Sequence, residues 1–256
     1  MDERSQTLYE KLLAHKKYAD VCPDAVRRII LECQDRYKKP KELEKAVRER
    51  LHGITSAFSE LDPQTELLAA RLTTGDDEGL AAVLSRHAST RERLPLSHMD
   101  ALYRRIFALT GPPESILDLA CGLNPLYLLH RLPKSCQIAG IDLSRRCVSM
   151  FPGGICADLL NDNALPDHPF QIALLFKILP LLERQRSGAG AQLLRRIHAR
   201  YLVVSFPTRT MGGRNVGMEP HYSQWMETHF PENRRIVARF STDNELFYIM
   251  EETRHA

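Results

Sequence analysis

The chain has 256 residues, of which 43% are hydrophobic and 26% charged, and this usage is typical of a globular protein that can bury a sizeable core. No apolar run approaches the roughly 18 residues that span a bilayer, and the first residues lack the apolar stretch of a secretory signal. We therefore expect a cytoplasmic protein without a membrane partner. The six cysteines show neither a CxxC pair nor Cys/His metal spacing, so we expect reduced, mostly buried thiols and no metal site.

The excess positive charge lies near the N-terminus. The net charge is only +3, but residues 1–56 hold 13 Lys and Arg against 10 Asp and Glu, whereas residues 57–256 hold 22 of each sign. Seven of the nine lysines also lie in the first segment. This asymmetry indicates a basic appendage on a neutral body, although a solvated helical surface would give the same composition.

The first 110 residues have the apolar spacing of helices. In residues 23–34, Pro23 suits a first helical position, and apolar side chains recur every three or four residues. A second such helix covers residues 41–54, where Gly53 is expected to mark its end. We predict a basic helical module over 1–75 and a second domain over 76–256, in which helices within 76–111 lead into an α/β core at 112–256.

From residue 115 onward, short apolar strands alternate with helices or loops. This order favours a parallel sheet covered on both faces. The last two strands are too close in sequence for a helical crossover, so they should form an antiparallel hairpin. A Rossmann-like, seven-stranded, mostly parallel sheet with a terminal hairpin is the layout of the class I methyltransferases, which use S-adenosyl-L-methionine. The candidate strands are 115–119, 137–141, 155–157, 172–176, 201–205, 235–240 and 245–250.

Polar residues at three successive strand ends predict a nucleoside site. The first strand runs into the turn ILDLACGLNP, which contains Gly122 but not the GxGxxG pattern of a pyrophosphate site, so a cofactor without phosphate is favoured. Asp142 ends the second strand, where it could accept both hydroxyls of a ribose, and Asp158 or its backbone could meet an adenine amine after the third. Each carboxylate alone is more often a turn or helix cap.

Five sequence blocks resemble the aminoglycoside-resistance methyltransferases of 16S rRNA. The resemblance spans nearly the whole chain and implies methyl transfer to N7 of a guanine in the decoding A site, within the assembled 30S ribosomal subunit. It also implies resistance to 4,6-disubstituted deoxystreptamine aminoglycosides. The blocks are HGITSAF (52–58), HASTRERL (87–94), ILDLACGLNPL (116–126), LLFKILPLLERQ (174–185) and SFPTRTMGGRNVGME (205–219).

The resemblance also implies which residues surround the cofactor. Arg93 would meet the methionine carboxylate, for which a guanidinium fork is well suited. The block that contains Arg93 equally reads as a capped helix start, and both interpretations can hold. Together with Gly122 of the first turn, the expected cofactor-binding residues are Phe58, His87, Ser89, Arg93, Ala120, Asp142, Asp158, Leu159, Phe176 and Gln185.

The end of the fourth strand bears on the chemistry. Enzymes that methylate an exocyclic amine usually carry an Asn/Asp-Pro-Pro-aromatic turn here, and enzymes that methylate a cytosine carbon need a cysteine nucleophile. This chain instead has Phe176-Lys177-Ile178-Leu179-Pro180 and no cysteine after 156. Guanine N7 has a free in-plane lone pair and no proton to lose. We therefore expect positioning alone to supply most of the catalysis and name no catalytic base. Lys177 either shapes the site or extends from an apolar strand to solvent.

Basic residues in two regions are candidates for contact with rRNA. The glycine-containing segment 207–221 follows the fifth strand, where a loop that grips the substrate belongs; the less favoured alternative is a surface crossover without contacts. Because the target base must be exposed, Tyr103, Phe206 and Trp225 are candidates for stacking on it. The predicted rRNA contacts are Lys16, Lys17, Arg27, Arg28, Lys41, Lys45, Arg48, Arg209 and Arg214.

Three alternatives remain open at this stage. The chain could methylate N1 of an A-site adenine, or a small molecule, although a small-molecule enzyme would not need the basic module. It could also be a catalytically idle rRNA-binding protein with the same fold. The HASTRERL block, Gly122 and Asp142 argue against a catalytically idle protein. Calorimetry with S-adenosylmethionine would distinguish an enzyme from such a binding protein.

Overall fold

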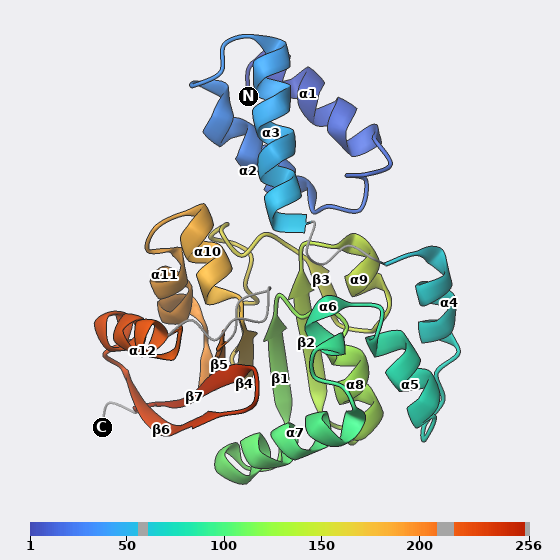
Figure 1. The fold of residues 1–256 in the computed structure, drawn as a ribbon, viewed down its shortest axis with the longest axis vertical. Helices are drawn as coiled ribbons and strands as arrows, with labels where there is room; N and C mark the ends of the chain where they lie inside the picture. The colour runs from blue at the N-terminus through green and yellow to red at the C-terminus, as the bar shows by residue number, and fades with distance from the viewer. Residues whose placement is uncertain (56–60, 209–217, 254–256) are drawn as a thin grey trace.

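Three N-terminal helices form a bundle beside the rest of the molecule (Figure 1). The computed structural model describes residues 1–55, 61–208 and 218–253. The bundle comprises α1 (Glu3–Ala14), α2 (Pro23–Gln34) and α3 (Pro40–Thr55), whose apolar faces bury Leu12, Ile29 and Leu43 between them. Pro23 begins α2 as predicted. The predicted end at Gly53 is wrong, because α3 continues to Thr55 and the partly buried Ile54 packs on the bundle core.

Four helices lead from the bundle to the sheet: α4 (Pro63–Ala70), α5 (Asp77–Leu84), α6 (Ala88–Arg91) and α7 (Leu96–Thr110). Asp62 and Asp76 cap α4 and α5 by accepting hydrogen bonds from backbone N–H groups. In α4, Ala69 joins the hydrophobic cluster that packs on the sheet rather than the cluster inside the bundle. We therefore propose that the boundary between the two parts lies between Thr55 and Leu61 instead of at residue 75.

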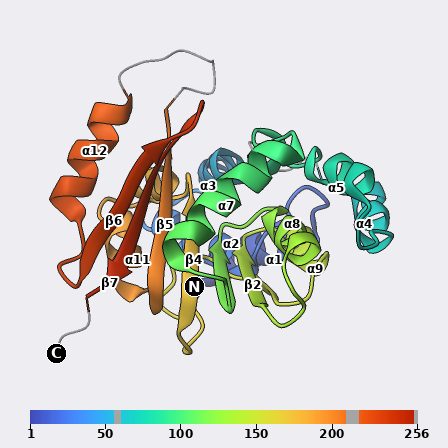
Figure 2. The ribbon, with the colours of Figure 1, turned by 90° about the horizontal axis from the view of Figure 1, so that it is seen from below.

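The seven strands form one sheet, and the predicted fold class is confirmed. The strand order is β3-β2-β1-β4-β5-β7-β6; β1 to β5 pair in parallel, while β7 lies antiparallel between β5 and β6 (Figure 2). The expected terminal hairpin is therefore present. The strands are β1 (Ser115–Leu119), β2 (Gln137–Asp142), β3 (Gly154–Cys156), β4 (Phe170–Phe176), β5 (Ala199–Pro207), β6 (Arg234–Ser241) and β7 (Glu245–Glu252).

Helices cover both faces of the sheet. Because successive strand residues point to opposite faces, Ile116 packs toward α7, α8 (Asn124–Arg131) and α9 (Arg145–Ser149), whereas Leu117 packs toward α10 (Leu179–Gln185), α11 (Ala189–Arg196) and α12 (Met218–His229). Both faces are apolar, which explains why the strands read as continuous hydrophobic runs. The carboxyl ends of β1 and β2 point toward the bundle (Figure 1).

Polar contacts join the bundle to this edge of the sheet. The Asp20 carboxylate accepts from the Arg146 N–H and from the Ser144 hydroxyl, both at 2.6 Å. Beside it, the Cys22 N–H donates to the Leu143 carbonyl at 2.7 Å. The loop after β2 is therefore tied directly to the turn between α1 and α2.

Candidate functional site

The turn after β1 has a backbone that excludes most side chains. Ala120 and Gly122 have φ angles of 56° and 53°, in the left-handed region that favours glycine. A Cβ atom at Gly122 would lie 2.7 Å from Ser89 Oγ and 2.8 Å from His87 Nδ1. His87 and Ser89, which begin the α6 segment, therefore pack directly against the turn, and their own side chains lie 2.8 Å apart. Four predicted cofactor residues meet here.

Asp142, at the end of β2, is fixed by backbone donors. Its Oδ2 accepts from the Gly122 N–H at 3.0 Å, and its Oδ1 accepts from the Ser144 N–H at 3.0 Å. A carboxylate offers about four lone-pair positions, so these two bonds leave acceptor capacity for two further donors. The half-buried carboxylate therefore presents oriented acceptors beside the turn, as the sequence predicted for a ribose site.

Arg93 is buried against a residue that the sequence analysis missed. Its Nε and Nη2 donate to the two carboxylate oxygens of Glu245 at 2.8 and 3.0 Å, and its Nη1 donates to the Ser89 carbonyl at 3.0 Å. The guanidinium also lies 4.7 Å from the ring centroid of Phe176. Glu245 comes from β7, 152 positions away in sequence, and no local pattern marks it.

Glu245 collects further partners from β5 and the turn after β4. The Ser205 hydroxyl donates to its Oε2 at 2.5 Å, and Lys177 Nζ lies 3.6 Å from its Oε1. Burial would raise the pKa of the Glu245 carboxyl, but Arg93 and Lys177 hold it below its ordinary value. Lys177 also pairs with Glu92, so it takes part in the polar network and does not simply extend to solvent.

Asp118 lies beneath the turn, with 2% of its surface exposed. Its Oδ2 accepts from Asn124 Nδ2 at 2.6 Å, and Asn124 Oδ1 accepts from the Tyr103 hydroxyl at 2.9 Å. Burial raises the pKa of Asp118 to about 7. Tyr103 stacks on Tyr127 in the core, and Phe206 is 1% exposed. The expectation that Tyr103 or Phe206 stacks on a target base is therefore wrong in this structure, because both rings already have packed partners.

Asp158, Leu159 and Gln185 lie together on the other side of the strand ends. Leu159 is buried, and Asp158 and Gln185 both accept from Arg28, at 2.6 and 3.0 Å. Arg28 is 7% exposed. The expectation that Arg28 contacts an rRNA phosphate is therefore wrong: its guanidinium faces inward and is already paired.

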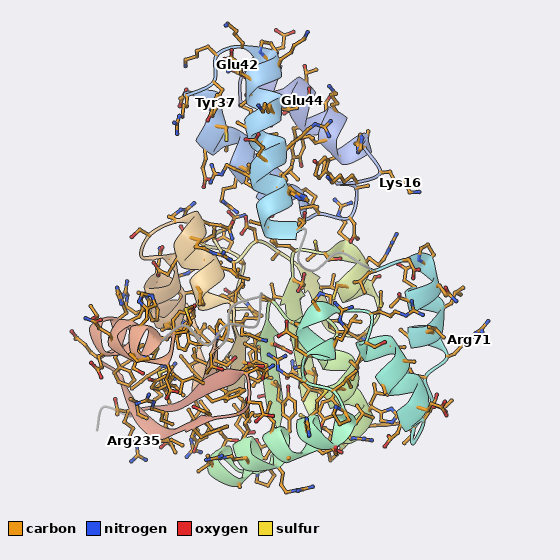
Figure 3. The ribbon with its side chains drawn as sticks, viewed as in Figure 1. Lys16, Tyr37, Glu42, Glu44, Arg71 and Arg235 are labelled. Carbon is orange, nitrogen blue, oxygen red and sulfur yellow. The ribbon has the colours of Figure 1, made fainter. Side chains whose placement is uncertain are left out.

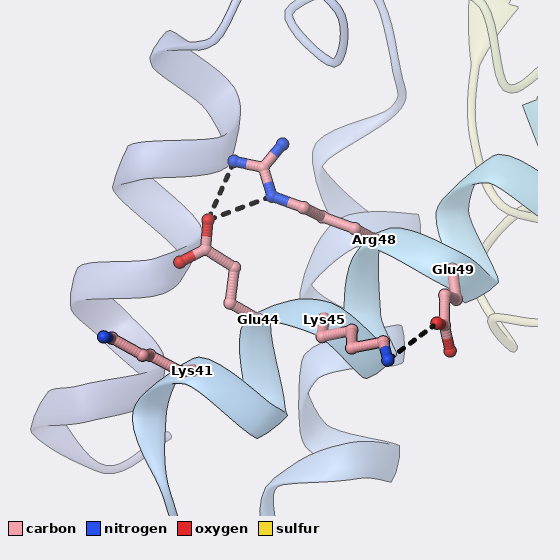
Figure 4. A pocket seen from close by; sticks show the side chains of 5 residues that line it. All are labelled: Lys41, Glu44, Lys45, Arg48 and Glu49. Carbon is pink, nitrogen blue, oxygen red and sulfur yellow. Dashed lines mark hydrogen bonds and ion pairs between the residues drawn. The ribbon is translucent and has the colours of Figure 1, made fainter.

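The other predicted rRNA residues of the bundle lie outside. Lys16, Lys17, Arg27, Lys41 and Lys45 are exposed, and Lys16 points away from the bundle (Figure 3). Arg48 is less available, since it pairs with Glu44 at 2.9 Å and covers the Tyr18 ring. Figure 4 shows a surface hollow on α3. It is lined by this pair, by the ion pair of Lys45 with Glu49, and by Lys41.

Acidic residues such as Glu42, Glu44 and Glu49 lie between these cations, so the outer surface of the bundle is not uniformly basic. Phe58, Arg209 and Arg214 lie outside the described residues.

All six cysteines lie within the described part of the chain and are free, five of them buried. Over the same part, no helix is long and apolar enough to cross a membrane. In residues 1–55, 61–208 and 218–253, no group of three metal-ligating side chains is found.

These residues fit S-adenosylmethionine. The turn bears a single glycine pressed against His87 and Ser89, which suits a close approach of backbone to a ligand without a pyrophosphate. The Asp142 carboxylate retains acceptor capacity next to that turn. The positive φ angles of Ala120 and Lys177 mark the ends of the adjacent strands β1 and β4, and such strained backbone gathers at ligand sites.

Comparison with known proteins decides the family. Residues 14–249 match the family described as ribosomal RNA methyltransferase (FmrO). The chain belongs to this family. The 16S rRNA (guanine(1405)-N(7))-methyltransferase of Serratia marcescens is 38% identical to it over 254 residues, covering 94% of this chain and 95% of that protein. The protein of the same description from Micromonospora echinospora is 31% identical, with coverage of 98% and 97%.

Two solved structures of 16S rRNA methyltransferases agree with this assignment. The crystal structure of the 16S rRNA methyltransferase RmtF in complex with S-adenosyl-L-homocysteine is 42% identical in sequence, with a TM-score of 0.86 and coverage of 99% of this chain and 100% of RmtF. The structure of the 16S rRNA methylase RmtB is 35% identical, with a TM-score of 0.82 and coverage of 97% and 98%. The resemblance inferred from the five sequence blocks is therefore confirmed.

Proposed function

We propose that this chain transfers a methyl group from S-adenosylmethionine to N7 of a guanine in 16S rRNA. The proposal rests on the hydrogen bond from the Gly122 N–H to Asp142. This contact suits a nucleoside site without a phosphate-binding loop, and the chain belongs to the rRNA methyltransferase family. Relatives that span almost the same length act on guanine N7 by their descriptions, which favours this base atom over adenine N1.

The side chains divide the work of holding the cofactor. Asp142 accepts the ribose hydroxyls, and the backbone at Ala120 and Gly122 lies against the nucleoside. Arg93 is paired with Glu245 over Phe176 and stays in the set, as the residue for the methionine carboxylate, on its place in the sequence. Asp158, Leu159 and Gln185 form the adenine side, and Phe58 remains in this set on its place in the sequence.

Catalysis by this chain is positioning. The cofactor supplies an electrophilic methyl group on a sulfonium sulfur. Guanine N7 attacks with a lone pair that is already free, so no side chain has to remove a proton before attack. Lys177 holds the turn after β4 through Glu92 and Glu245, which fixes the wall of the site without acting as a base. Alignment of the two reacting atoms then accounts for most of the rate increase.

The assembled 30S subunit is the substrate in this proposal. The exposed cations Lys16, Lys17, Arg27, Lys41 and Lys45 lie on the bundle toward which the ends of β1 and β2 point. A bundle that contacts phosphates there would bring the cofactor edge of the sheet to the target base. Arg209 and Arg214 stay in this set because of their place in the segment after β5.

Mapping the modified nucleotide tests the proposal. Purified protein is incubated with S-adenosylmethionine and 30S subunits from a susceptible bacterium, and 16S rRNA is cleaved at N7-methylguanine and read by primer extension. We expect one new cleavage at an A-site guanine. A modified adenine N1, which blocks extension without cleavage, or an unmodified rRNA despite cofactor binding would overturn the proposal.

Expression in a susceptible bacterium tests the consequence. Methylation at N7 removes an acceptor and fixes a positive charge on the base, so a drug ammonium group loses a charge-assisted hydrogen bond of about 1.5–3 kcal/mol. This corresponds to roughly tenfold to hundredfold weaker drug binding before repulsion is added. We expect protection against gentamicin and kanamycin but little against neomycin. Strong protection against neomycin would contradict the assignment to guanine N7.

A further inference from the structure

One arginine of the bundle reaches into the cofactor side of the sheet. Arg28 lies on α2, yet its guanidinium is 7% exposed and bonds to residues that follow β3 and end α10. Nε donates to Asp158 Oδ2 at 2.6 Å, and Nη2 donates to Gln185 Oε1 at 3.0 Å. Both acceptors belong to the expected adenine side of the site. Arg28 thus bridges two segments that contact one side of the proposed nucleoside.

Arg28 completes the hold on the Asp158 carboxylate. The Leu160 N–H donates to Asp158 Oδ1 at 3.1 Å, so the carboxylate has a backbone donor on one oxygen and the guanidinium on the other. Asp158 is 3% exposed. A buried carboxylate with one partner removed is costly, because the remaining charge is left without compensation. The orientation of the segment after β3 therefore depends on a residue of the bundle.

A second set of charged side chains, centred on Glu32, holds Arg28 in place. Its Nη1 donates to Glu32 at 3.2 Å, and Glu32 also accepts from Arg186 at 3.1 Å and pairs with Arg50 of α3. Burial would raise the pKa of Glu32, but the surrounding arginines hold it below its ordinary value. The network thus connects α2 and α3 with Arg186, the residue that follows Gln185.

We propose that Arg28 is a positioning residue for the cofactor, through which the N-terminal bundle builds the adenine side of the site. The inference rests on the proposed function, since it assigns Asp158 and Gln185 to the nucleoside. Arg28 holds the two acceptors at a fixed separation. Cofactor binding and the seating of the bundle are then coupled, and this coupling acts equally in both directions.

Calorimetry with S-adenosylhomocysteine on the full chain tests the proposal. The variant Arg28→Met keeps an unbranched side chain of similar reach but removes all three donor nitrogens, and we expect the dissociation constant to rise at least tenfold. Arg36→Met is the matched control, because Arg36 follows α2 and is exposed; its dissociation constant should stay within twofold of wild type. Binding by Arg28→Met within twofold of wild type would overturn the proposal.

A second variant separates positioning from stability. Arg28→Met leaves the Asp158 charge buried and unpaired, whereas Arg28→Met with Asp158→Asn removes that charge as well. We expect the double variant to recover much of the lost thermal stability but not the affinity for S-adenosylhomocysteine. Recovery of both would reduce Arg28 to a purely structural role. Arg28→Lys should restore affinity in part, because an ammonium can pair with Asp158 but lacks the fork that also reaches Gln185.

The same titrations distinguish this idea from the proposed function. If wild-type protein binds S-adenosylhomocysteine and Arg28→Met binds equally well, only the role of Arg28 fails. If folded wild-type protein does not bind S-adenosylhomocysteine, the methyltransferase proposal fails and the positioning role falls with it.

Discussion

Asp142 is held by main-chain donors, so its removal should affect ligand binding more than folding. Its two bonds come from the Gly122 and Ser144 N–H groups at the edge of the sheet. We expect Asp142→Ala to lose at least tenfold in affinity for S-adenosylhomocysteine, because hydrogen bonds to a charged group contribute about 1.5–3 kcal/mol each. Calorimetry measures the loss, and the melting temperature serves as the folding control. Unchanged affinity in the folded variant would remove Asp142 from the site.

Asp118 gives the cofactor-free protein a specific pH dependence. Its pKa is raised by burial to about 7, above the ordinary value of 3.8, so the folded state keeps a proton that the unfolded state releases. The contribution of Asp118 to the free energy of unfolding is therefore complete below about pH 4. It is lost as pH rises toward 7, with a slope of at most about 1.4 kcal/mol per pH unit.

Urea unfolding at pH 5 and pH 8 checks this expectation. Asp118→Asn carries no titrating group there, so the stability of wild type relative to the variant should fall between the two pH values. An equal difference at both values would show that Asp118 does not change protonation in this range.

At the scale of elements, the same substitution should have opposite effects in a turn and in a helix. Gly122 has a φ of 53° and a blocked Cβ position, whereas Gly53 lies in α3 with open space around its Cβ position. We expect Gly122→Ala to destabilise the fold and weaken cofactor binding. Gly53→Ala should stabilise it by about 0.5–1 kcal/mol, because glycine is a poor helix former. Denaturant midpoints compare the two, and a stabilised Gly122→Ala variant would contradict the geometry of the turn.

The elements were predictable from sequence where local patterns determine them. Apolar runs bounded by turns located all seven strands, and Asp142 was found because it ends one of them. Arg28 was assigned to rRNA and Glu245 was missed as a site residue, because their partners lie 130 and 152 positions away. The helix end at Gly53 was also misplaced, since packing of Ile54 on the bundle outweighs the local preference of glycine. Long-range pairing and packing are therefore what the sequence pattern lacked.

At the scale of the whole molecule, the exposed lysines of the bundle should control affinity for the ribosome without changing affinity for the cofactor, because it is the buried Arg28 of the bundle that reaches the cofactor side. We expect Lys41→Glu combined with Lys45→Glu to weaken 30S binding and to reduce its salt dependence by about one unit of logarithmic slope per lost phosphate contact. Filter binding at several salt concentrations measures this, and calorimetry should show unchanged binding of S-adenosylhomocysteine.

Charge reversal elsewhere is the control for that result. Arg71→Glu with Arg104→Glu makes the same change in net charge at exposed positions outside the bundle, on or next to α4 and α7. We expect 30S affinity to fall much less in this variant. Equal losses in the two variants, or methylation of an isolated A-site hairpin as efficient as that of intact 30S, would contradict docking through the bundle.

The bundle has a hydrophobic core of its own, and this affects how hybrid enzymes could be made. A bundle transplanted from a relative would bring its apolar interior intact, because Leu12, Ile29 and Leu43 pack mainly within it. Its fit to a new catalytic domain would depend on the junction, where Leu143 and Cys156 pack on the bundle cluster, Arg28 pairs with Asp158, and Asp20 accepts from Ser144. In a working hybrid, these partners would have to be exchanged together.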